Sequence, residues 1–328
     1  MSIGEFDLIN RFFNKPRQAG QSSGIQLGIG DDCALLAPSP GMTLAVSTDM
    51  LVAGRHFLST ITPQRLGHKS LAVNLSDLAA MGAKPMAFTL SLALPEASES
   101  WAEDFAQGLF ALADAHHCPL IGGDTTAGPL CISITVFGEI PFAQALKRSG
   151  ACVDDGIYIS HPAQGGIGDA RLMLEALRGQ ARLSGDDFGL ALERMERPTP
   201  RIELGMALRD MATAAIDLSD GLLGDLSHIL QASGVGASID ADSIARSPLL
   251  QKQPEALQRL CTLAGGDDYE LVFTAPAHRH EQVMAAAYQS HVSVTRIGKI
   301  DKAPGIRIYD AQGHELANRY QSFDHFKS

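Results

Sequence analysis

Apolar positions along the first half of the chain alternate between strand-like and helix-like spacing. Two segments have the helical pattern. In 63–81, three leucines recur at i, i+4 and i+7 behind a proline that a first turn tolerates, and a glycine follows at a common C-cap position. In 101–117, one phenylalanine and two leucines repeat this spacing. Short apolar stretches predict strands over 25–29, 43–47, 87–94 and 130–139.

The second half continues the alternation with shorter elements. Strands are predicted over 158–160, 214–217, 235–239 and 270–274, and helices over 165–177, 201–211 and 222–232. Interleaving of this kind is typical of an α/β fold, or of α+β layers, rather than of a helix bundle. Because 328 residues are many for one core, we expect two domains, 1–145 and 146–328, joined by a crossover near 141–155.

Composition narrows the class of protein. Apolar residues make up 45% of the chain and charged residues 19%, which is an ordinary globular balance. The formal charge of -11 disfavours nucleic acid as a partner, because a negative surface repels a phosphate backbone. It does not disfavour nucleotides, since divalent metals can bridge carboxylates to phosphates.

Nothing in the sequence predicts export or membrane insertion. The first 20 residues contain acidic and basic side chains and no long apolar run, so no secretory signal is expected. The most apolar region, 71–95, is interrupted by Asp77, Lys84 and Pro85 and is not expected to span a membrane. The five cysteines are scattered and odd in number, which favours reduced thiols over disulfides or zinc. These features predict a cytoplasmic protein.

Acidic residues gather in six short motifs, several of which directly follow an apolar stretch. Strand ends are where α/β proteins collect ligand-binding side chains. Any one motif alone is better explained as a helix cap or a solvated turn; Ser219 and Asp220, for example, suit the start of a helix near Leu222. The motifs are Gly28–Asp32 (GIGDD), Ser47–Asp49 (STD), Asn74–Asp77 (NLSD), Gly122–Thr126 (GGDTT), Asp217–Gly221 (DLSDG) and Gly265–Leu271 (GGDDYEL).

Asp77 stands apart because it lies inside a predicted helix rather than at its start. Asn74, three residues earlier, shares its helix face, and the other neighbours are apolar. A buried carboxylate there needs a partner or a metal ion, and the sequence leaves a structural and a functional explanation equally open.

Convergence of several carboxylates would require a cation, since two charges about 4 Å apart repel by roughly 4 kcal/mol at an effective dielectric near 20. Oxygen ligands from Asp, Ser and Thr suit Mg²⁺ or Mn²⁺ rather than Zn²⁺. Mg²⁺ commonly shares its coordination shell with phosphate oxygens, which indicates nucleotide chemistry. The chain contains neither a GxxxxGK[ST] phosphate loop nor the HRD motif of protein kinases.

Taken together and in this order, the motifs resemble the thiamine-monophosphate kinase family. The most specific parts are LGIGDDCA, STDMLVAGRHF, AVNLSDLAAMGA, LIGGDTT, AIDLSDGL and GGDDYEL, and the resemblance runs over nearly the whole chain. It implies the two-domain architecture of the aminoimidazole ribonucleotide synthetase superfamily. It also implies an N-terminal sheet shared across a homodimer, with ATP bound largely in the N-terminal domain.

The resemblance further implies roles for individual residues. Implied metal ligands are Asp32, Ser47, Thr48, Asp49, Asp77, Asp124 and Asp217, with Asp220 holding a further ion. Implied ATP contacts are Gly123, Asp124, Arg148 and Ser219, and implied contacts to the thiamine substrate are His56, Asp267 and Phe323. Two positions depart from the family pattern. Asp267 replaces the usual glutamate and is one methylene shorter, and Phe323 replaces a tyrosine or tryptophan, so it can stack but has no hydroxyl.

The implied activity is transfer of the γ-phosphoryl group of ATP to thiamine monophosphate, directly and in line, with several Mg²⁺ ions. Two alternatives remain at this stage. One is a sister ATP-dependent synthetase that acts on a purine-pathway amidine or amide, which would share the metal ligands but not the GGDDYEL motif. The other is an acidic protein without enzymatic activity that binds divalent ions or a partner; clusters at strand ends and inside an apolar helix argue against it.

Overall fold

The chain forms two compact units, each of which mixes helix and sheet as the sequence predicted. The computed structural model describes residues 4–14 and 24–320. Unit 1 comprises Met1–Leu78 and Ala83–Ala143, and unit 2 comprises Ala79–Gly82 and Gln144–Ser328. No described helix is both long enough and apolar enough to cross a membrane.

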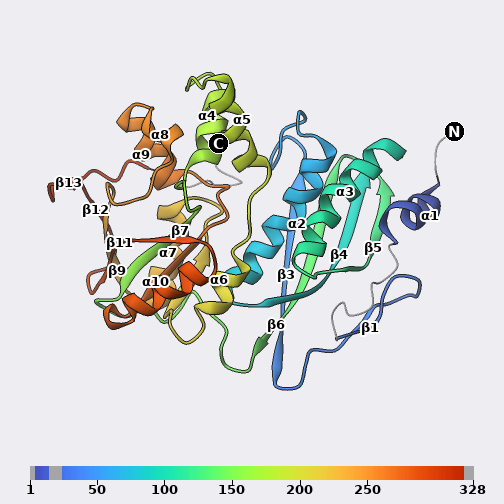
Figure 1. Ribbon diagram of the computed structural model, residues 1–328, viewed down its shortest axis with the longest axis horizontal. Helices are drawn as coiled ribbons and strands as arrows, with labels where there is room; N and C mark the ends of the chain where they lie inside the picture. The colour runs from blue at the N-terminus through green and yellow to red at the C-terminus, as the bar shows by residue number, and fades with distance from the viewer. Residues whose placement is uncertain (1–3, 15–23, 321–328) are drawn as a thin grey trace. The chain divides into compact units, whose positions relative to one another are not determined.

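Unit 1 is built on a four-stranded sheet with two long helices, α2 and α3, running over it (Figure 1). Strand β6 pairs antiparallel with β3 and β4, and β5 pairs parallel with β4, so β3 and β5 are the edge strands. The elements of the sheet and its helices are β3 (Met42–Val52), α2 (Pro63–Ala80), β4 (Lys84–Leu94), α3 (Glu99–Ala115), β5 (Leu120–Ala127) and β6 (Cys131–Pro141). Before them come α1 (Glu5–Leu8), a π-helical turn (Ile9–Phe13), β1 (Ile25–Leu27) and β2 (Leu35–Leu36).

The helices α2 and α3 can lie close together because each has a glycine where they meet. A Cβ atom on Gly67 of α2 would overlap the carbonyl oxygen of Phe105, and one on Gly108 of α3 would overlap that of Gln64. The predicted helical spacing is confirmed, since the leucines at 71, 75 and 78 and those at 109 and 112 are buried. Gly82 follows α2 with a φ of 66°, the left-handed conformation expected of a C-cap glycine.

The face of the sheet opposite α2 presents apolar side chains to solvent along β3. Five of the six alternate residues on this face are apolar and between 36% and 56% exposed: Met42, Leu44, Val46, Met50 and Val52. The sixth, between Val46 and Met50, is Thr48. We call the five apolar residues the β3 apolar row. Exposed apolar surface of this extent on an edge strand is unusual in a monomer and is typical of an interaction surface.

Unit 2 contains a seven-stranded sheet in the order β13-β12-β9-β11-β7-β10-β8, antiparallel except for the parallel pair β12 and β9. Every residue of β7, β8 and β10 is buried, so these strands are covered on both faces. The strands are β7 (Gly156–His161), β8 (Ala214–Asp217), β9 (Gly236–Asp240), β10 (Leu271–Ala275), β11 (Ser293–Asp301), β12 (Gly305–Tyr309) and β13 (Glu315–Leu316). The helices are α4 (Asp169–Leu177), α5 (Gly185–Glu196), α6 (Ile202–Ala207), α7 (Leu222–Ser233), α8 (Pro248–Gln251), α9 (Glu255–Ala264), the 3-10 turn Ala277–Arg279 and α10 (His280–Gln289).

Two expectations about unit 1 are wrong. The strand predicted to end at Ser47 continues to Val52, so the STD motif lies inside β3 rather than after it. The GGDTT motif, expected in a turn-like setting, lies within strand β5. Paired glycines and polar residues suggested a turn, but Gly123 is required in the strand because a Cβ there would overlap the backbone of Leu90 on β4.

Helix propensity alone predicts that replacing a glycine of α2 or α3 by alanine stabilises the protein. The close contact between these helices predicts the opposite. We expect Gly108→Ala to lower the free energy of unfolding by about 2 kcal/mol, because the added methyl group forces the two helices apart. The matched control is Gly189→Ala in α5, where a Cβ meets nothing within 4 Å, and which should be neutral or raise stability by up to about 1 kcal/mol. Urea unfolding of both variants measures the difference, and equal stability of the two would contradict the close packing.

Candidate active site

In unit 1 the structure brings together two motifs that lie far apart in the sequence. The hydroxyl of Ser47 on β3 donates a hydrogen bond to a carboxylate oxygen of Asp77 on α2. Asp49 lies two residues after Ser47 on the same strand, and its backbone N–H donates to the Asn74 side-chain oxygen at 3.0 Å. Ser47 and Asp49 therefore share the face that α2 covers, and the sequence prediction that Asn74 and Asp77 share one helix face is confirmed.

Asp77 is the one partly exposed residue in an otherwise buried stretch of α2. From Leu71 to Ala80 every residue except Asp77 is buried, and Asp77 is half-buried. Asn74, by contrast, has no exposed surface, and its amide donates to the carbonyl of Ser70 at 2.9 Å. Asn74 thus has a structural role that ties β3 to α2, while the carboxylate of Asp77 remains within reach of solvent.

The register of the sheet places three other implied residues elsewhere. Thr48 points to the opposite face from Ser47, where its hydroxyl pairs with that of Thr135 on β6 at 2.5 Å. Asp124 on β5 is paired with Ser91, which is in turn aligned through β6 with Met50 and not with Asp49. Three strand spacings, roughly 14 Å, separate Asp124 from β3. The side chains of Thr48 and Asp124 therefore do not join Ser47 and Asp77, and neither does Gly123 beside Asp124.

Two further residues of unit 1 lie in loops. Asp32 is exposed, and its backbone N–H donates to the carboxylate of Asp31 at 3.1 Å. His56 follows β3, and its Nδ1 accepts the backbone N–H of Val52 at 3.0 Å. Because Nδ1 is the acceptor, the proton of the neutral imidazole is on Nε2. Nε2 is therefore the nitrogen that can donate a hydrogen bond.

In unit 2 the motif DLSDG forms the connection from β8 to α7. Asp217 ends the strand and is 6% exposed, while Ser219 and Asp220 are half-buried in the loop. The alternative explanation of Ser219 and Asp220 as caps of this helix is wrong. The N-cap of α7 is Gly221, with no side-chain cap, and the loop N–H groups are bound by Asp225 inside the helix.

Asp225 is not among the site residues predicted from the sequence. It is 2% exposed, and one carboxylate oxygen accepts the N–H groups of Ser219, Asp220 and Gly221 at 3.1, 3.1 and 3.0 Å. The pKa of Asp225 is raised to about 7, with burial as the largest cause, the charge of Asp220 adding to it and the three backbone hydrogen bonds opposing it. The signal in the sequence was an aspartate four residues after a glycine at a helix start, a pattern too common to single out.

The motif GGDDYEL lies directly against this loop. The N–H of Asp267 donates to the Ser219 carbonyl at 2.8 Å, and the N–H of Tyr269 donates to the Leu218 carbonyl at 2.9 Å. Asp267 and Tyr269 both have positive φ values, 71° and 52°, so the backbone turns sharply on either side of Asp268. The two motifs, nearly fifty residues apart in sequence, are thereby adjacent in unit 2.

The last acidic residue of this motif, Glu270, is completely buried and fully paired. Arg201 donates to both of its oxygens, Arg194 donates to one at 3.1 Å, and the Ser160 hydroxyl donates to the other at 2.6 Å. Burial alone would raise the pKa of Glu270, but the guanidinium groups of Arg201 and Arg194 hold it below its usual value. From the sequence, Glu270 is only the predicted start of a strand, because none of its partners is near it in sequence.

Asp268 has a different environment. It is 2% exposed, and both of its oxygens lie within 3.0 Å of the N–H of Gly168, at the start of α4. Burial raises the pKa of Asp268 well above its usual value; the charge of Arg194 opposes this shift, and the charges of Asp169 and Glu270 add to it.

The remaining implied residues are Arg148 and Phe323. Arg148 is exposed in unit 2, and its carbonyl accepts the Ser233 hydroxyl at the end of α7 at 3.3 Å. Phe323 lies outside the described residues.

The residues of unit 1 fit a magnesium ion by their chemistry. Across residues 4–14 and 24–320, no three side chains of His, Cys, Asp or Glu come together closely enough to hold a metal ion. Mg²⁺, however, is typically bound through one or two carboxylates, with water and substrate phosphates completing the shell. Asp77, with the hydroxyl of Ser47 bonded to it and Asp49 on the same sheet face, provides oxygen ligands of this kind.

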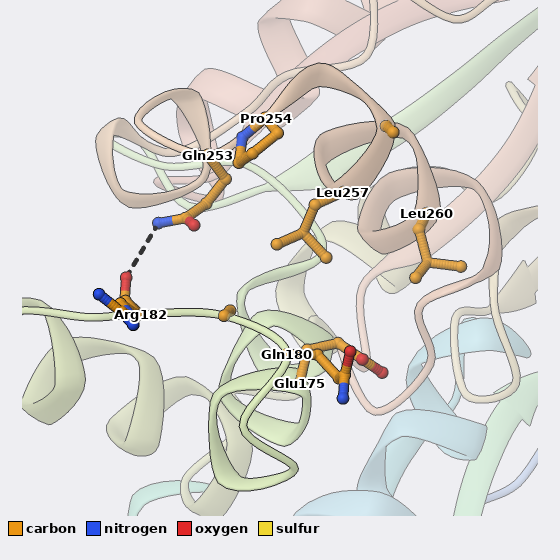
Figure 2. Close-up of a pocket in the computed structure, with 9 residues that line it drawn as sticks. Glu175, Gln180, Arg182, Gln253, Pro254, Leu257 and Leu260 are labelled. Atoms are coloured by element: carbon orange, nitrogen blue, oxygen red, sulfur yellow. Dashed lines mark hydrogen bonds between the residues drawn. The ribbon is translucent and has the colours of Figure 1, made fainter.

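A cavity of about 540 Å³ lies in unit 2 between the end of α4 and α9 (Figure 2). Apolar side chains of Leu257 and Leu260 face the polar side chains of Glu175, Gln180 and Arg182 across it. None of the implied site residues is among those that line this cavity, so it does not belong to the candidate site.

Comparison with known proteins places these motifs in a family. Residues 30–140 match the model of the AIR synthase related protein, N-terminal domain, and residues 157–311 match that of the C-terminal domain. The chain is 45% identical to thiamine-monophosphate kinase of Salmonella typhimurium over 99% of both chains. The crystal structure of thiamine-monophosphate kinase from Stenotrophomonas maltophilia K279a is 46% identical, with a TM-score of 0.81 over 87% of this chain and 91% of that one. AaThiL complexed with AMPPCP and TMP is 29% identical, with a TM-score of 0.75 over 88% and 89% of the two chains.

The raised pKa of Asp268 predicts a pH-dependent stability. An aspartate in the unfolded chain loses its proton at about pH 4, whereas the buried Asp268 of the folded protein keeps its proton to higher pH. Between those two pKa values the folded state holds the extra proton, so the free energy of unfolding falls as pH rises. Asp268→Asn removes this loss, and its stability relative to the parent should rise from about pH 5 to about pH 8. Denaturant unfolding at both pH values checks this, with the exposed Asp186→Asn as control, and a constant difference across the range would exclude a raised pKa.

Proposed function

Because the chain belongs to the AIR synthase related family and, within it, to the thiamine-monophosphate kinases, we propose that it transfers the γ-phosphoryl group of ATP to thiamine monophosphate, forming thiamine diphosphate. The observation that carries this proposal is the 45% identity with a thiamine-monophosphate kinase over 99% of both chains. The AaThiL complex supports both substrates, since AMPPCP is an analogue of ATP and the second ligand is TMP.

The reaction needs alignment and charge neutralisation more than proton transfer. The acceptor is a phosphate oxygen of thiamine monophosphate, which is already anionic near neutral pH, so no general base is required. Two anionic phosphates must instead be held in line against their mutual repulsion. We therefore propose direct transfer without a phosphorylated enzyme intermediate.

The metal ligands in unit 1 are proposed to be Asp32, Ser47, Thr48, Asp49, Asp77 and Asp124, and in unit 2 Asp217 and Asp220. Because Thr48 and Asp124 do not join Ser47 and Asp77 in the sheet, they are proposed to hold different ions from these two. The best support is for Ser47 and Asp77, whose side chains are in contact, with Asp49 on the same face of β3. More than one Mg²⁺ ion is proposed. Bound Mg²⁺ supplies positive charge that offsets the phosphate charges as the phosphoryl group moves.

The substrate contacts are assigned by the chemistry of the side chains. Gly123, Asp124, Arg148 and Ser219 are proposed to contact ATP, and the exposed guanidinium of Arg148 suits a phosphate. His56, Asp267 and Phe323 are proposed to contact thiamine monophosphate. Nε2 of His56 is a donor because Nδ1 already accepts the Val52 N–H, and the carboxylate of Asp267 is an acceptor for the amino group of the pyrimidine.

We also propose that the protein is a homodimer formed through the unit 1 sheet. The β3 apolar row supports a second copy as its occupant, because this edge strand presents five apolar side chains that are 36% to 56% exposed. We further propose a cytoplasmic location, which suits an enzyme that consumes ATP.

The first experiment is to incubate the purified protein with Mg-ATP and thiamine monophosphate and to separate the thiamine esters by chromatography. Metal-dependent formation of thiamine diphosphate is expected. No product from the folded protein, together with ATP consumption on a purine-pathway amidine such as formylglycinamidine ribonucleotide, would replace the proposal with the sister synthetase.

Asp77→Asn tests the metal site directly. We expect turnover to fall about 100-fold, because the variant weakens metal binding at the transferring phosphate and each 1.4 kcal/mol of lost stabilisation is about tenfold in rate. The melting temperature should stay close to that of the parent, since Asp77 is half-buried and an amide oxygen can still accept the Ser47 hydroxyl. Asp114→Asn, exposed on α3 of the same unit, is the control. Near-parental turnover with unchanged Mg²⁺ dependence would favour the structural explanation of Asp77.

Val46→Glu tests the dimer. Val46 is 56% exposed in the middle of the β3 apolar row, and a carboxylate there would be desolvated by a second copy, so we expect the variant to be monomeric where the parent is dimeric. Tyr288→Glu, at a residue of unit 2 that is 82% exposed, should leave the dimer intact. Sedimentation velocity distinguishes the two species. A monomeric parent, or a dimeric Val46→Glu, would rule out this interface.

A further inference from the structure

Asp225 binds the backbone of the Asp217–Gly221 loop at three consecutive residues. A single carboxylate oxygen accepts three consecutive backbone N–H groups, from Ser219, Asp220 and Gly221, at 3.0 to 3.1 Å. The N–H of Asp225 in turn donates to the carbonyl of Gly221 at 3.0 Å. Three successive N–H groups can converge on one atom only if the backbone curls around it, so the position of Asp225 sets the curvature of the loop.

The outer side of the same loop is bound by the GGDDYEL motif. The carbonyls of Leu218 and Ser219 accept the N–H groups of Tyr269 and Asp267, and the N–H of Leu218 donates to the Glu270 carbonyl at 2.8 Å. The backbone between Leu218 and Gly221 is therefore bound on one side by Asp225 and on the other by the GGDDYEL motif.

Close packing leaves the loop little freedom to adjust. Gly221 has a φ of 116°, and a Cβ there would lie 2.9 Å from the Ala264 backbone. A Cβ on Gly266 would overlap the carbonyl oxygen of Ser219. These close contacts at Gly221 and Ser219 limit the shifts by which the loop could adjust to loss of the Asp225 acceptor.

We infer that Asp225 is a positioning residue that holds Ser219 and Asp220 in the orientation in which they bind ATP and metal. This inference rests on the proposed function, which assigns those two roles. Asp225 does not itself touch substrate; it acts through the backbone that carries the two side chains. Residues that orient metal ligands in this way typically change metal affinity 10- to 100-fold when they are replaced.

The test compares three variants of the full-length protein in the thiamine diphosphate assay, with the Mg²⁺ concentration that gives half-maximal rate as the readout. Asp225→Ala removes the acceptor and should raise that concentration about tenfold. Asp225→Asn keeps an oxygen that can accept the same three N–H groups and should restore a value close to that of the parent. Asp155→Ala is the matched control, because Asp155 is 3% exposed and accepts the Cys152 N–H and the Thr213 hydroxyl of the same unit, but contacts neither motif.

Asp155→Ala should lower the melting temperature without changing the Mg²⁺ requirement, which separates positioning from general destabilisation. A parental Mg²⁺ requirement in Asp225→Ala would overturn the inference, as would an Asp225→Asn variant impaired as strongly as Asp225→Ala.

Amide hydrogen exchange of the peptide containing Ser219–Gly221 gives a second readout that does not depend on activity. These three amides should exchange slowly in the parent and in Asp225→Asn, and rapidly in Asp225→Ala, and rapid exchange in the parent would exclude the proposed hold on the loop. If the parent makes no thiamine diphosphate, the proposed function fails, while slow exchange in the parent together with rapid exchange in Asp225→Ala would still show that Asp225 positions the loop.

Discussion

A carboxylate without access to water needs hydrogen-bond donors or positive charges from the protein. In unit 2 this constraint applies to Glu270, which is fully buried. Its two oxygens are bound by Arg201 at the N-cap of α6, by Arg194 of α5 and by Ser160 of β7. Removing one partner of such a buried pair typically destabilises a protein by about 3–5 kcal/mol, so these elements are tied to the start of β10. Because β10 pairs with both β7 and β8, the place of Asp217 at the end of β8 follows from the same constraint.

The GGDDYEL motif therefore combines two kinds of acidic residue. Asp268 and Glu270 are buried, and their partners hold the backbone, whereas Asp267 is half-buried and adjacent to the Ser219 loop. The alternation follows from the positive φ values of Asp267 and Tyr269, which turn successive side chains in different directions. A rigid, buried support beneath a more accessible side chain is the arrangement that binding sites require, because a ligand-binding group must be held before the ligand arrives.

In unit 1 the polar groups of α2 that contact β3 are Asn74, which is buried, and Asp77, which is only half-buried. Asn74 is enclosed and satisfies the N–H of Asp49, while Asp77 one turn later is half-buried and accepts the Ser47 hydroxyl. The helix therefore offers one structural and one accessible polar group on the same face. The two-residue period of β3 then decides which neighbours can join them, since Ser47 and Asp49 face α2 and Thr48 faces the opposite side with Thr135.

The sequence by itself determined the alternation of helices and strands, the helix faces of α2 and α3, the mixed two-unit fold and the family, because these depend on local spacing and on motifs that can be matched residue by residue. It also identified Asp77 as unusual from its position in an apolar helix. Only the tertiary structure decided that GGDTT is a strand, that Asp124 lies across the sheet from Asp49, and that Asp225 and Glu270 support the two motifs of unit 2. Those facts depend on which distant segments pack together: Gly123 is explained only by Leu90, and Glu270 only by arginines about seventy residues away. Periodicity carries no record of such partners, because a hydrogen bond or a close backbone contact between distant segments leaves no regular pattern in either one.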